Sequence, residues 1–285
     1  MKYAVIDIGS NSVRLMMSDG VKSIYKKVKN TRLAEGMKDG FLSSEAIKRT
    51  ALAVSEFYFV AKKENADKIY CFATAAVRQA KNPEVFINEV NKLCGLTVEV
   101  IKGEKEAELG LKGVLGGCDG GVIDVGGAST EIAIINDGNI IYSKSINIGA
   151  VKLKDACGQD RKLSEIKVLE AIKEFGEIFN TKFFAIGGTA TSISSMMQEL
   201  VIYNPEIVDG FKICKNELKN LVDKLYSLTV EERKNLKGLQ PERAEVIAGG
   251  ALILLKLMQN FNIESVTVSE RDNLEGYLMT KMEKL

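Results

Sequence analysis

The segment 121–135 combines two carboxylates with a glycine-rich turn, and it reads G-V-I-D-V-G-G-A-S-T-E-I-A-I-I. Asp124 stands at the end of one apolar run, and Glu131 stands at the start of the next. Glycines let a backbone approach an oxyanion closely, small hydroxyl side chains donate hydrogen bonds to it, and paired carboxylates can hold a hard cation such as Mg²⁺. The segment therefore predicts a loop that binds phosphate and metal. A plain β-hairpin with a Gly-Gly turn is the alternative.

The same pattern stands near the N-terminus, where an apolar run leads into Asp7-Ile8-Gly9-Ser10-Asn11-Ser12 and a second apolar run follows. Both copies read strand, D-[I/V]-G, small polar loop, strand and Asp-Gly turn, with the turns at 19–20 and 137–138. Each turn precedes a third strand-like run, as in a β-hairpin. The repetition indicates an internal duplication, although Asp7 alone could simply accept hydrogen bonds within a turn.

The chain contains no histidine. This excludes Ser–His and Cys–His nucleophilic pairs, His-ligated zinc and a histidine general base, so acid–base chemistry falls to carboxylates, lysines or tyrosines. Two further turns, at 74–78 and at Gly187-Gly188-Thr189, follow an apolar strand and open a helix. Such turns can direct backbone N–H groups at an anion, so both are candidate phosphate sites.

The length of 285 residues exceeds the size at which a single core usually stops growing, so we expect two domains. The glycine pair at 116–117 marks the boundary and gives lobes 1–117 and 118–285. With 46% hydrophobic and 27% charged residues, each lobe can bury a full core, and disorder is not expected.

The formal net charge of +1 gives no global field that attracts polyanions, so we expect no binding of a nucleic acid duplex. The 5 cysteines are widely spaced without a C-x-x-C pair, which fits reduced thiols in a cytosolic protein. The N-terminus turns polar too early for a signal peptide, and no apolar run reaches membrane-spanning length. We therefore expect a cytoplasmic protein without a membrane partner, and a homodimer is left open.

Capping signals and periodicity predict alternating strands and helices. In the first lobe we expect a helix from Ser43 or Ser44 to about residue 65, a strand over 68–73, and helices over 83–93 and 103–116. In the second lobe we expect a helix over 163–179, a strand over 182–186 and a mostly helical region from 187 to 260. A strand at 266–268 and a terminal helix from Asn273 follow, and this helix could pack back on the first lobe.

Two such halves suggest an α/β duplication with ligand between the lobes.

The paired D-[I/V]-G loops resemble the phosphate loops of the actin-like ATPase (ribonuclease H-like) fold. At finer grain the whole chain resembles the exopolyphosphatase / guanosine pentaphosphate phosphohydrolase (Ppx/GppA) family. The matching motifs are I-D-I-G-S-N-S-V-R-L at 6–15, T-R-L-A-E-G at 31–36, A-T-A-A-V-R at 73–78, G-E-K-E-A at 103–107, D-V-G-G-A-S-T-E at 124–131, I-G-A-V-K-L at 148–153, G-G-T at 187–189 and P-E-R-A-E-V-I-A-G-G at 241–250. Ordered motifs over nearly the full length are more specific than any one of them.

The resemblance implies a role for each matched residue. A glutamate of the G-E-K-E-A segment would orient the attacking water, which by position is Glu106, with Glu104 as the alternative. Without the resemblance, a solvated glutamate in a first helical turn is the simpler interpretation. Asp124, Glu131 and Asp7 would hold Mg²⁺. Phosphate would be bound by Gly9, Ser10, Asn11, Ser12, Gly126, Gly127, Ser129, Gly188 and Thr189, and its charge neutralised by Arg14, Arg32 and Arg78, of which Arg78 is also taken as catalytic.

The chain departs from the family pattern at three places. Ala128 stands where the family loop usually has a third glycine, Asp209 stands where His is frequent, and Leu274 stands where Arg is frequent. The chain also lacks the helical extension of longer members, so it resembles the short two-domain class.

The resemblance implies a Mg²⁺-dependent hydrolase that releases terminal phosphate from inorganic polyphosphate or guanosine pentaphosphate. A weakly catalytic sensor of polyphosphate or a phosphorylated guanine nucleotide is the alternative, and a sugar or acyl kinase of the same fold is a third.

Overall fold

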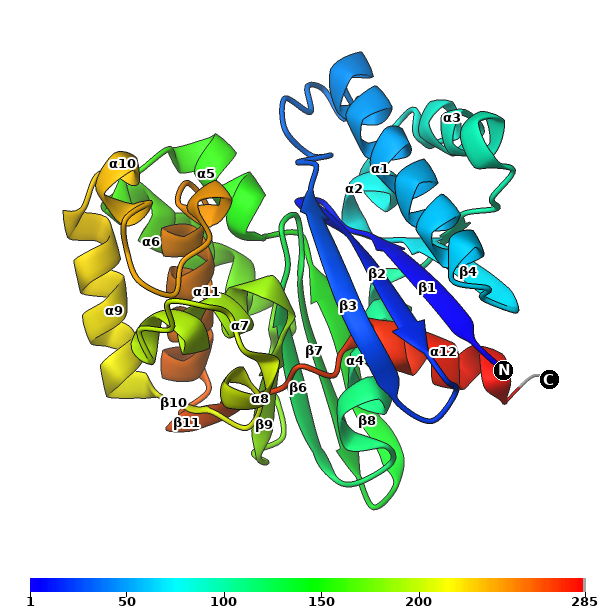
Figure 1. Cartoon of the computed structure of the whole chain (residues 1–285). Helices are drawn as coiled ribbons and strands as arrows, with labels where there is room; N and C mark the ends of the chain where they lie inside the picture. Colours follow the sequence, from blue (N-terminus) through cyan, green and yellow to red (C-terminus); the bar gives the residue numbers. More distant parts are fainter. Residues whose placement is uncertain (284–285) are drawn as a thin grey trace.

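The computed structural model describes residues 1–283, and these contain two mixed β-sheets that lie side by side with helices around them (Figure 1). In the first sheet, β1 (Tyr3–Ile8), β2 (Ser12–Ser18) and β3 (Ser23–Asn30) form an antiparallel meander. The strands β4 (Lys68–Ala73) and β5 (Glu99–Val100) continue the sheet parallel to β1, in the order β3-β2-β1-β4-β5.

The second sheet repeats this plan. β6 (Gly120–Val125), β7 (Thr130–Asn136) and β8 (Asn139–Ile146) form the meander, and β9 (Phe183–Ile186) and β11 (Ser265–Val268) run parallel to β6. The short strand β10 (Lys212–Cys214) is added at the edge. The predicted duplication is confirmed, and the two equivalent sheets form the actin-like fold.

Helices of the first half begin and end at the residues that the capping signals indicate. The hydroxyl of Ser43 accepts a hydrogen bond from the backbone N–H of Ala46 at the start of α1 (Ser44–Lys63). α2 (Ala75–Gln79) follows β4, and α3 begins with the proline in Pro83–Cys94. α3 and α4 (Gly103–Leu115) each end at a left-handed glycine, Gly95 and Gly116.

The second half departs from expectation at several helices. α5 (Ala150–Cys157) was not predicted, and α6 (Arg161–Ile172) passes into a short 3₁₀ turn that stops at Gly176, whose φ of 68 favours glycine. The region from Pro241 begins with a 3₁₀ turn, and the apolar helix α11 (Ile247–Asn260) starts only afterwards. The remaining helices are α7 (Gly187–Met197), α8 (Pro205–Val208), α9 (Lys215–Ser227), α10 (Val230–Arg233) and α12 (Asn273–Met282).

Alternate residues of each central strand face different helices. In β1, Ile6 and Ile8 pack toward α1, whereas Tyr3 and Val5 pack toward α12. In β6, Ile123 and Val125 face the large core that includes α11, whereas Val122 faces α4. α12, near the end of the chain, therefore covers the first sheet, and α4, from the first half, covers the second.

α4 and α12 also pack tightly against each other (Figure 1). A Cβ atom added to Gly113 would lie 2.0 Å from the carbonyl oxygen of Asp272, and one added to Gly276 would lie 1.9 Å from that of Leu109. These glycines let the two helices cross at backbone contact. The boundary at 117 stays a prediction, and the exchange of α4 and α12 means that each lobe has a helix from the other half of the chain.

None of the helices within residues 1–283 combines the length and the apolar character needed to cross a membrane.

Candidate active site

A cavity of about 770 Å³ lies between the two lobes, and both glycine-rich loops line it. The first loop, between β1 and β2, contributes Gly9 to Ser12, and the second, between β6 and β7, contributes Gly126, Gly127 and Ser129. The two loops touch, because a Cβ atom added to Gly127 would lie 2.9 Å from the Cβ of Ser10. Loops that are far apart in the sequence thus form adjoining walls of one site.

Asp7 and Asp124 are the next-to-last residues of the two strands that precede these loops, β1 and β6. Both strands place alternate side chains on opposite faces, so Asp7 shares a face with Val5, and Asp124 shares a face with Val122. These are the faces that α12 and α4 cover. The carboxylates therefore meet the first turns of these two helices, which supply the remaining charged groups of the site.

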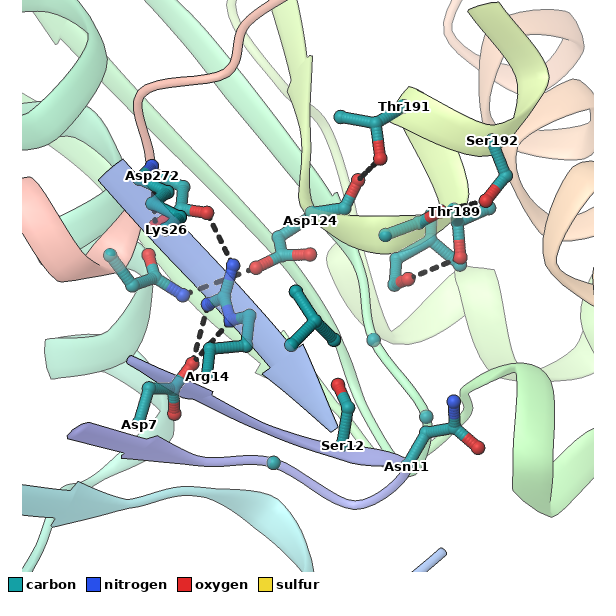
Figure 2. Close-up of a pocket in the computed structure, with 18 of the residues that line it drawn as sticks. Asp7, Asn11, Ser12, Arg14, Lys26, Asp124, Thr189, Thr191, Ser192 and Asp272 are labelled. Atoms are coloured by element: carbon teal, nitrogen blue, oxygen red, sulfur yellow. Dashed lines mark hydrogen bonds and ion pairs between the residues drawn. The ribbon is translucent and has the colours of Figure 1, made fainter. Parts of the chain in front are cut away.

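Arg14 lies between carboxylates from both halves of the chain, and Figure 2 shows its guanidinium between Asp7, Asp272 and Asp124. Its Nε donates to Asp7 Oδ2 over 2.9 Å, and its two terminal nitrogens form ion pairs with Asp7 and Asp272. Lys26 also contacts Asp272, with its Nζ 3.8 Å from Oδ1. Burial raises the pKa of Asp7, and the nearby Arg14 opposes that shift. Arg14 thus ties the first lobe to the segment before α12.

Asp124 has a different environment. Its Oδ2 accepts a hydrogen bond from the Asn273 side-chain amide over 3.2 Å, and no described cation lies within ion-pair distance of it. Burial, together with the negative charge of Glu106, raises the pKa of Asp124 to about 8. Since Glu131 is the cross-strand partner of Asp124, the second lobe concentrates carboxylates where the first lobe pairs Asp7 with Arg14.

Glu106 lines the cavity from the first turn of α4, whereas Glu104 is exposed and lies outside the lining. The carboxylate of Glu106 accepts a hydrogen bond from Arg78 Nη1 over 2.9 Å, and the same nitrogen donates to the carbonyl of Ile101. Burial raises the pKa of Glu106 to about 7, although the Arg78 charge and hydrogen bond lower it. A buried carboxylate that can change protonation state near neutral pH is suited to accept a proton.

Three predicted site residues lie outside the cavity lining. Arg78 stands behind Glu106, and Glu131 is buried beside it, where it accepts a 2.6 Å hydrogen bond from the Ser145 hydroxyl. Arg32 reaches across the lobes instead, and its guanidinium lies 3.5 Å from the Glu245 carboxylate. Thr189 does line the cavity, but its hydroxyl donates to the carbonyl of Val125 over 2.8 Å (Figure 2).

The three departures from the family pattern have local explanations. Ala128 is buried and has no left-handed backbone, so its methyl group causes no strain there. Leu274 is fully buried among the apolar residues between α12 and the first sheet. Asp209 accepts a hydrogen bond from the backbone N–H of Glu270 and does not line the cavity.

Several cavity-lining residues are absent from the prediction, and the ones that bear most on the site are Lys26, Asp272, Asn273 and Arg243. Asp272 and Asn273 were visible only as the start of a helix, since Asp272 and Glu275 form a capping box. Arg243 belongs to the P-E-R-A-E motif, which carried no assigned role. Their place in the site depends on how the two halves pack, and no local pattern reports that.

The charge of the lining is acidic overall. The carboxylates that line the cavity are Asp7, Glu106, Asp124, Glu206, Glu270, Asp272 and Glu275. The cationic side chains are fewer, namely Arg14, Lys26, Arg243 and Arg271. An anionic ligand therefore needs either an added cation or contacts that avoid the carboxylates.

A divalent cation fits one part of this cavity. No group of three or more acidic or cysteine side chains within residues 1–283 is arranged as a metal cage. Mg²⁺, however, commonly uses one or two carboxylates together with substrate phosphates and water. Asp124 meets this requirement because it lies in the cavity without an ion-pair partner, whereas Asp7 is already paired with Arg14.

Two equivalent sheets, a glycine-rich loop on each side of the cleft and acidic groups at the ends of the central strands define a protein of the actin-like ATPase fold with a site suited to phosphate. The chain belongs to the Ppx/GppA phosphatase family, whose sequence pattern matches residues 11–285. The family membership predicted from the motifs is thereby confirmed.

Curated relatives differ in how much of their length this chain spans. It is 27% identical to exopolyphosphatase 2 of Mycobacterium tuberculosis, with 98% of both chains covered. It is 31% identical to a bifunctional 3-dehydroquinate synthase/phosphatase of Fusobacterium nucleatum and spans 46% of that protein. It is 32% identical to a guanosine-5'-triphosphate,3'-diphosphate pyrophosphatase of Pseudoalteromonas translucida and spans 60% of it.

Solved structures agree on the fold. The crystal structure of an Aquifex aeolicus Ppx/GppA family member matches with a TM-score of 0.82 at 27% identity and covers 100% of this chain. The crystal structure of an exopolyphosphatase-like protein matches with a TM-score of 0.93 at 26% identity, again over 100% of this chain.

Proposed function

We propose that this protein is a Mg²⁺-dependent phosphoanhydride hydrolase that releases the terminal phosphate of inorganic polyphosphate, of guanosine pentaphosphate, or of both. One observation carries the proposal: Glu106, a buried carboxylate with a pKa of about 7, faces a cavity walled by two phosphate-type loops. The names of the relatives support the same reaction class.

In the proposed reaction, water attacks the terminal phosphorus and the bond to the bridging oxygen breaks. Glu106 accepts the proton of the attacking water, and the products are inorganic phosphate and a chain shortened by one phosphate. Arg78 holds Glu106 in place through its 2.9 Å hydrogen bond. Backbone N–H groups of the loops at 10–12 and 127–129 are suited to bind the phosphate oxygens, whereas those of Gly9 and Gly126 already donate to the carbonyls of Ser12 and Ser129.

Asp124 would hold the Mg²⁺, with substrate oxygens completing the coordination. The ion would supply positive charge that the acidic lining lacks. Asp7 and Glu131, the other predicted ligands, each use one oxygen to pair with Arg14 or Ser145, and the second oxygen of each is buried without a hydrogen-bond partner. Because Asp124 lines the cavity without an ion pair, we place the ion nearer Asp124.

Phosphate release tests the proposal most directly. We would measure it from long-chain polyphosphate and from guanosine pentaphosphate, each with Mg²⁺ and with EDTA. Release that requires Mg²⁺ is the expected result, and the faster substrate identifies the preference. Tight binding of either compound without release would contradict the proposal and favour a sensor. ATP consumption that depends on an acceptor would favour a kinase.

The Glu106→Gln variant tests the proposed base. We expect it to lower kcat by about 10²–10⁴-fold with substrate binding retained, because a general base typically contributes that much. Glu104→Gln is the matched control, since Glu104 lies one residue beyond the helix start and is exposed. Turnover of Glu106→Gln near that of Glu104→Gln would refute the assignment.

We also propose a cytoplasmic location. The cysteines at 71, 94, 118, 157 and 214 are all free thiols in the structure, which suits a reducing compartment.

A further inference from the structure

The helix α6 carries apolar side chains on the face that it turns away from the protein. Ile166 is 62% exposed, Leu169 is 44% exposed and Leu163 is 39% exposed. The buried residues of the helix are Ser164, Val168 and Ile172. At about 3.6 residues per turn, Ile166 points almost opposite to these buried residues, and the two leucines lie about 60° to either side of it. The helix is therefore apolar on two faces, and residues 1–283 cover only one of them.

Ion pairs hold the sides of α6 against neighbouring helices and leave its outer face open. Arg161 pairs with Asp223 of α9 over 2.6 Å, and Glu165 lies 3.5 Å from Lys256 of α11. The outer face also lies away from the proposed reaction, since no residue of α6 lines the cavity between the lobes within the described part of the chain. A partner on this face would leave the active site accessible.

The outer face has a self-complementary sequence. Residues 162–170 read K-L-S-E-I-K-V-L-E. Read backwards, with each charge exchanged for its opposite, the sequence is the same except at Ser164 and Val168, and these two side chains are buried. The centre of the pattern is Ile166, the most exposed apolar residue of the helix. A two-fold axis beside this residue would bring apolar groups together and set opposite charges across from each other.

An antiparallel pair of α6 helices uses this pattern directly. Ile166 meets Ile166 of the second copy on the axis, and Leu163 and Leu169 surround that contact. Lys162 lies at the same height as Glu170 of the second copy, with each about 40° from the centre of the stripe, so the two long side chains can meet. Both side chains are exposed, and neither has an ion pair with any residue from 1 to 283.

We propose that the protein forms a two-fold symmetric dimer in which the α6 helices of two copies pack antiparallel across Ile166. A parallel pair is disfavoured, because it sets the two Lys162 side chains, and likewise the two Glu170 side chains, beside each other. The 12 residues of α6 span about 18 Å. A contact between two such helices falls at or below the low end of specific interfaces, roughly 1,200 Å². The dimer is therefore weak, with a dissociation constant in the micromolar range or above.

Sedimentation equilibrium, from micromolar to millimolar protein, tests for the dimer. The average mass should rise with concentration from that of one chain toward that of two. Ile166→Lys should weaken dimerisation about 100-fold or more, because two isoleucines leave the interface and two positive charges meet on the axis. Leu52→Lys is the matched control, since Leu52 is 59% exposed on α1, and it should leave the dissociation constant unchanged.

Charge exchange tests the antiparallel arrangement. Lys162→Glu and Glu170→Lys should each weaken the dimer about 3- to 10-fold, because each sets two pairs of like charges across the axis. The Lys162→Glu/Glu170→Lys double variant should recover the original dissociation constant to within about 2-fold, since both pairs are restored with their charges reversed. High salt should reduce all of these differences. Thermal unfolding in dilute solution checks that each variant is folded.

Three results would overturn the dimer. The first is the mass of a single chain at every concentration. The second is a dimer that Ile166→Lys weakens no more than Leu52→Lys does, which would place the interface elsewhere. The third is a double variant that dimerises no better than the two single charge variants, which would exclude the antiparallel pairing. All three leave the proposed hydrolase untouched, because its site lies on other elements.

Discussion

Asp7 and Asp124 occupy equivalent positions in the two hairpins, but the residues opposite them differ. Asp7 lies opposite Arg14 in the β1–β2 pair, whereas Asp124 lies opposite Glu131 in the β6–β7 pair. Opposite charges across a strand pair stabilise it, and like charges do the reverse. The first copy is thus neutralised within the protein, whereas the carboxylates of the second copy are the ones that the proposed Mg²⁺ would neutralise.

The Asp124→Asn variant should reveal how much folding stability the protein loses by burying the Asp124 carboxylate beside Glu131. The pKa of Asp124 is about 8 in the folded protein against 3.8 as the ordinary value, so the folded state holds its proton longer than the unfolded state. The metal-free protein therefore loses stability as the pH rises from about 4 to about 8. Asp124→Asn should raise Tm at pH 8 by roughly 3–10 °C and change it little at pH 4.

Thermal unfolding in EDTA at both pH values measures this effect, and the variant should also lose phosphate release. If Tm changed with pH by the same amount in the variant and in the unaltered protein, Asp124 would not be the source of the pH-dependent loss of stability.

Arg78 should set the pH at which the proposed base becomes active. Its charge and its hydrogen bond lower the pKa of Glu106, so Arg78→Gln should raise that pKa above about 7. Because a base must be deprotonated, the midpoint of the pH–rate profile should then move to higher pH, with a lower maximal rate.

Phosphate release measured from pH 5 to pH 9 checks the shift, and Arg161→Gln should keep the original midpoint. A midpoint that stays in place for Arg78→Gln would mean that Glu106 is not the titrating group.

At the scale of elements, the crossing of α4 and α12 positions the site. α4 carries Glu106 in its first turn, and α12 begins directly after Asp272, so both helices bring charged groups to the cleft. Their separation is fixed by Gly113 and Gly276, which admit no side chain. The crossing thus controls the position of groups that lie about one to two helical turns away along each helix.

Gly276→Ala should disturb this crossing. The added methyl group would lie 1.9 Å from the Leu109 carbonyl oxygen, so we expect a loss of about 1–3 kcal/mol in the free energy of unfolding and a lower kcat. Gly249→Ala in α11 is the control. Its nearest neighbour is the flexible end of Leu153 at 3.3 Å, so its effect should stay within about 1 kcal/mol. Chemical denaturation gives both values, and equal losses would contradict the argument.

Elements with strong local signals could be predicted to within a few residues. Ser43, Pro83 and the glycines at 95 and 116 mark helix ends by chemistry that acts over a few residues. α5 was missed because Gly149, at its N-cap, offers no capping side chain. β10 has only 3 residues, too few for an alternating pattern to stand out.

In the site, too, only the residues that stand in local sequence motifs could be predicted. Asp7, Asp124 and Glu106 stand in motifs, so their chemistry could be predicted, and the structure places all three in the cavity. The pairing of Arg14 with Asp272 spans 258 residues, and it exists only because α12 returns to the first sheet. The close approach of the Arg243 guanidinium to Gly188 likewise depends on tertiary packing. The roles assigned to the predicted residues stay predictions until the variants are measured.

At the scale of the whole molecule, neither half of the chain contains all of its own core. The first sheet buries Tyr3, Val5 and Phe72 beneath Tyr277 and Leu278 of α12. The second sheet buries Val122 and Ala133 beneath α4. The two lobes are therefore expected to unfold together, in spite of their separate sheets.

Fragments test this dependence. Residues 1–117 alone should show no cooperative unfolding transition, because one face of the sheet is uncovered and the apolar face of α4 has no partner. The same fragment with residues 269–285 attached by a flexible linker should regain a transition, since α12 can then cover the sheet. Circular dichroism during heating distinguishes the two, and a sharp transition of the shorter fragment would count against the expected dependence.

The large separation in sequence between the first sheet and α12 also bears on how the protein is made. A ribosome adds about 5–20 residues per second, so the 258 residues that separate Arg14 from Asp272 take roughly 13–52 s to add. During much of that time the first sheet has been synthesised, but the helix that covers Tyr3 and Val5 has not. The apolar face of the first sheet therefore stays exposed until α12 is made, and we expect the nascent chain to bind chaperones that shield apolar surface.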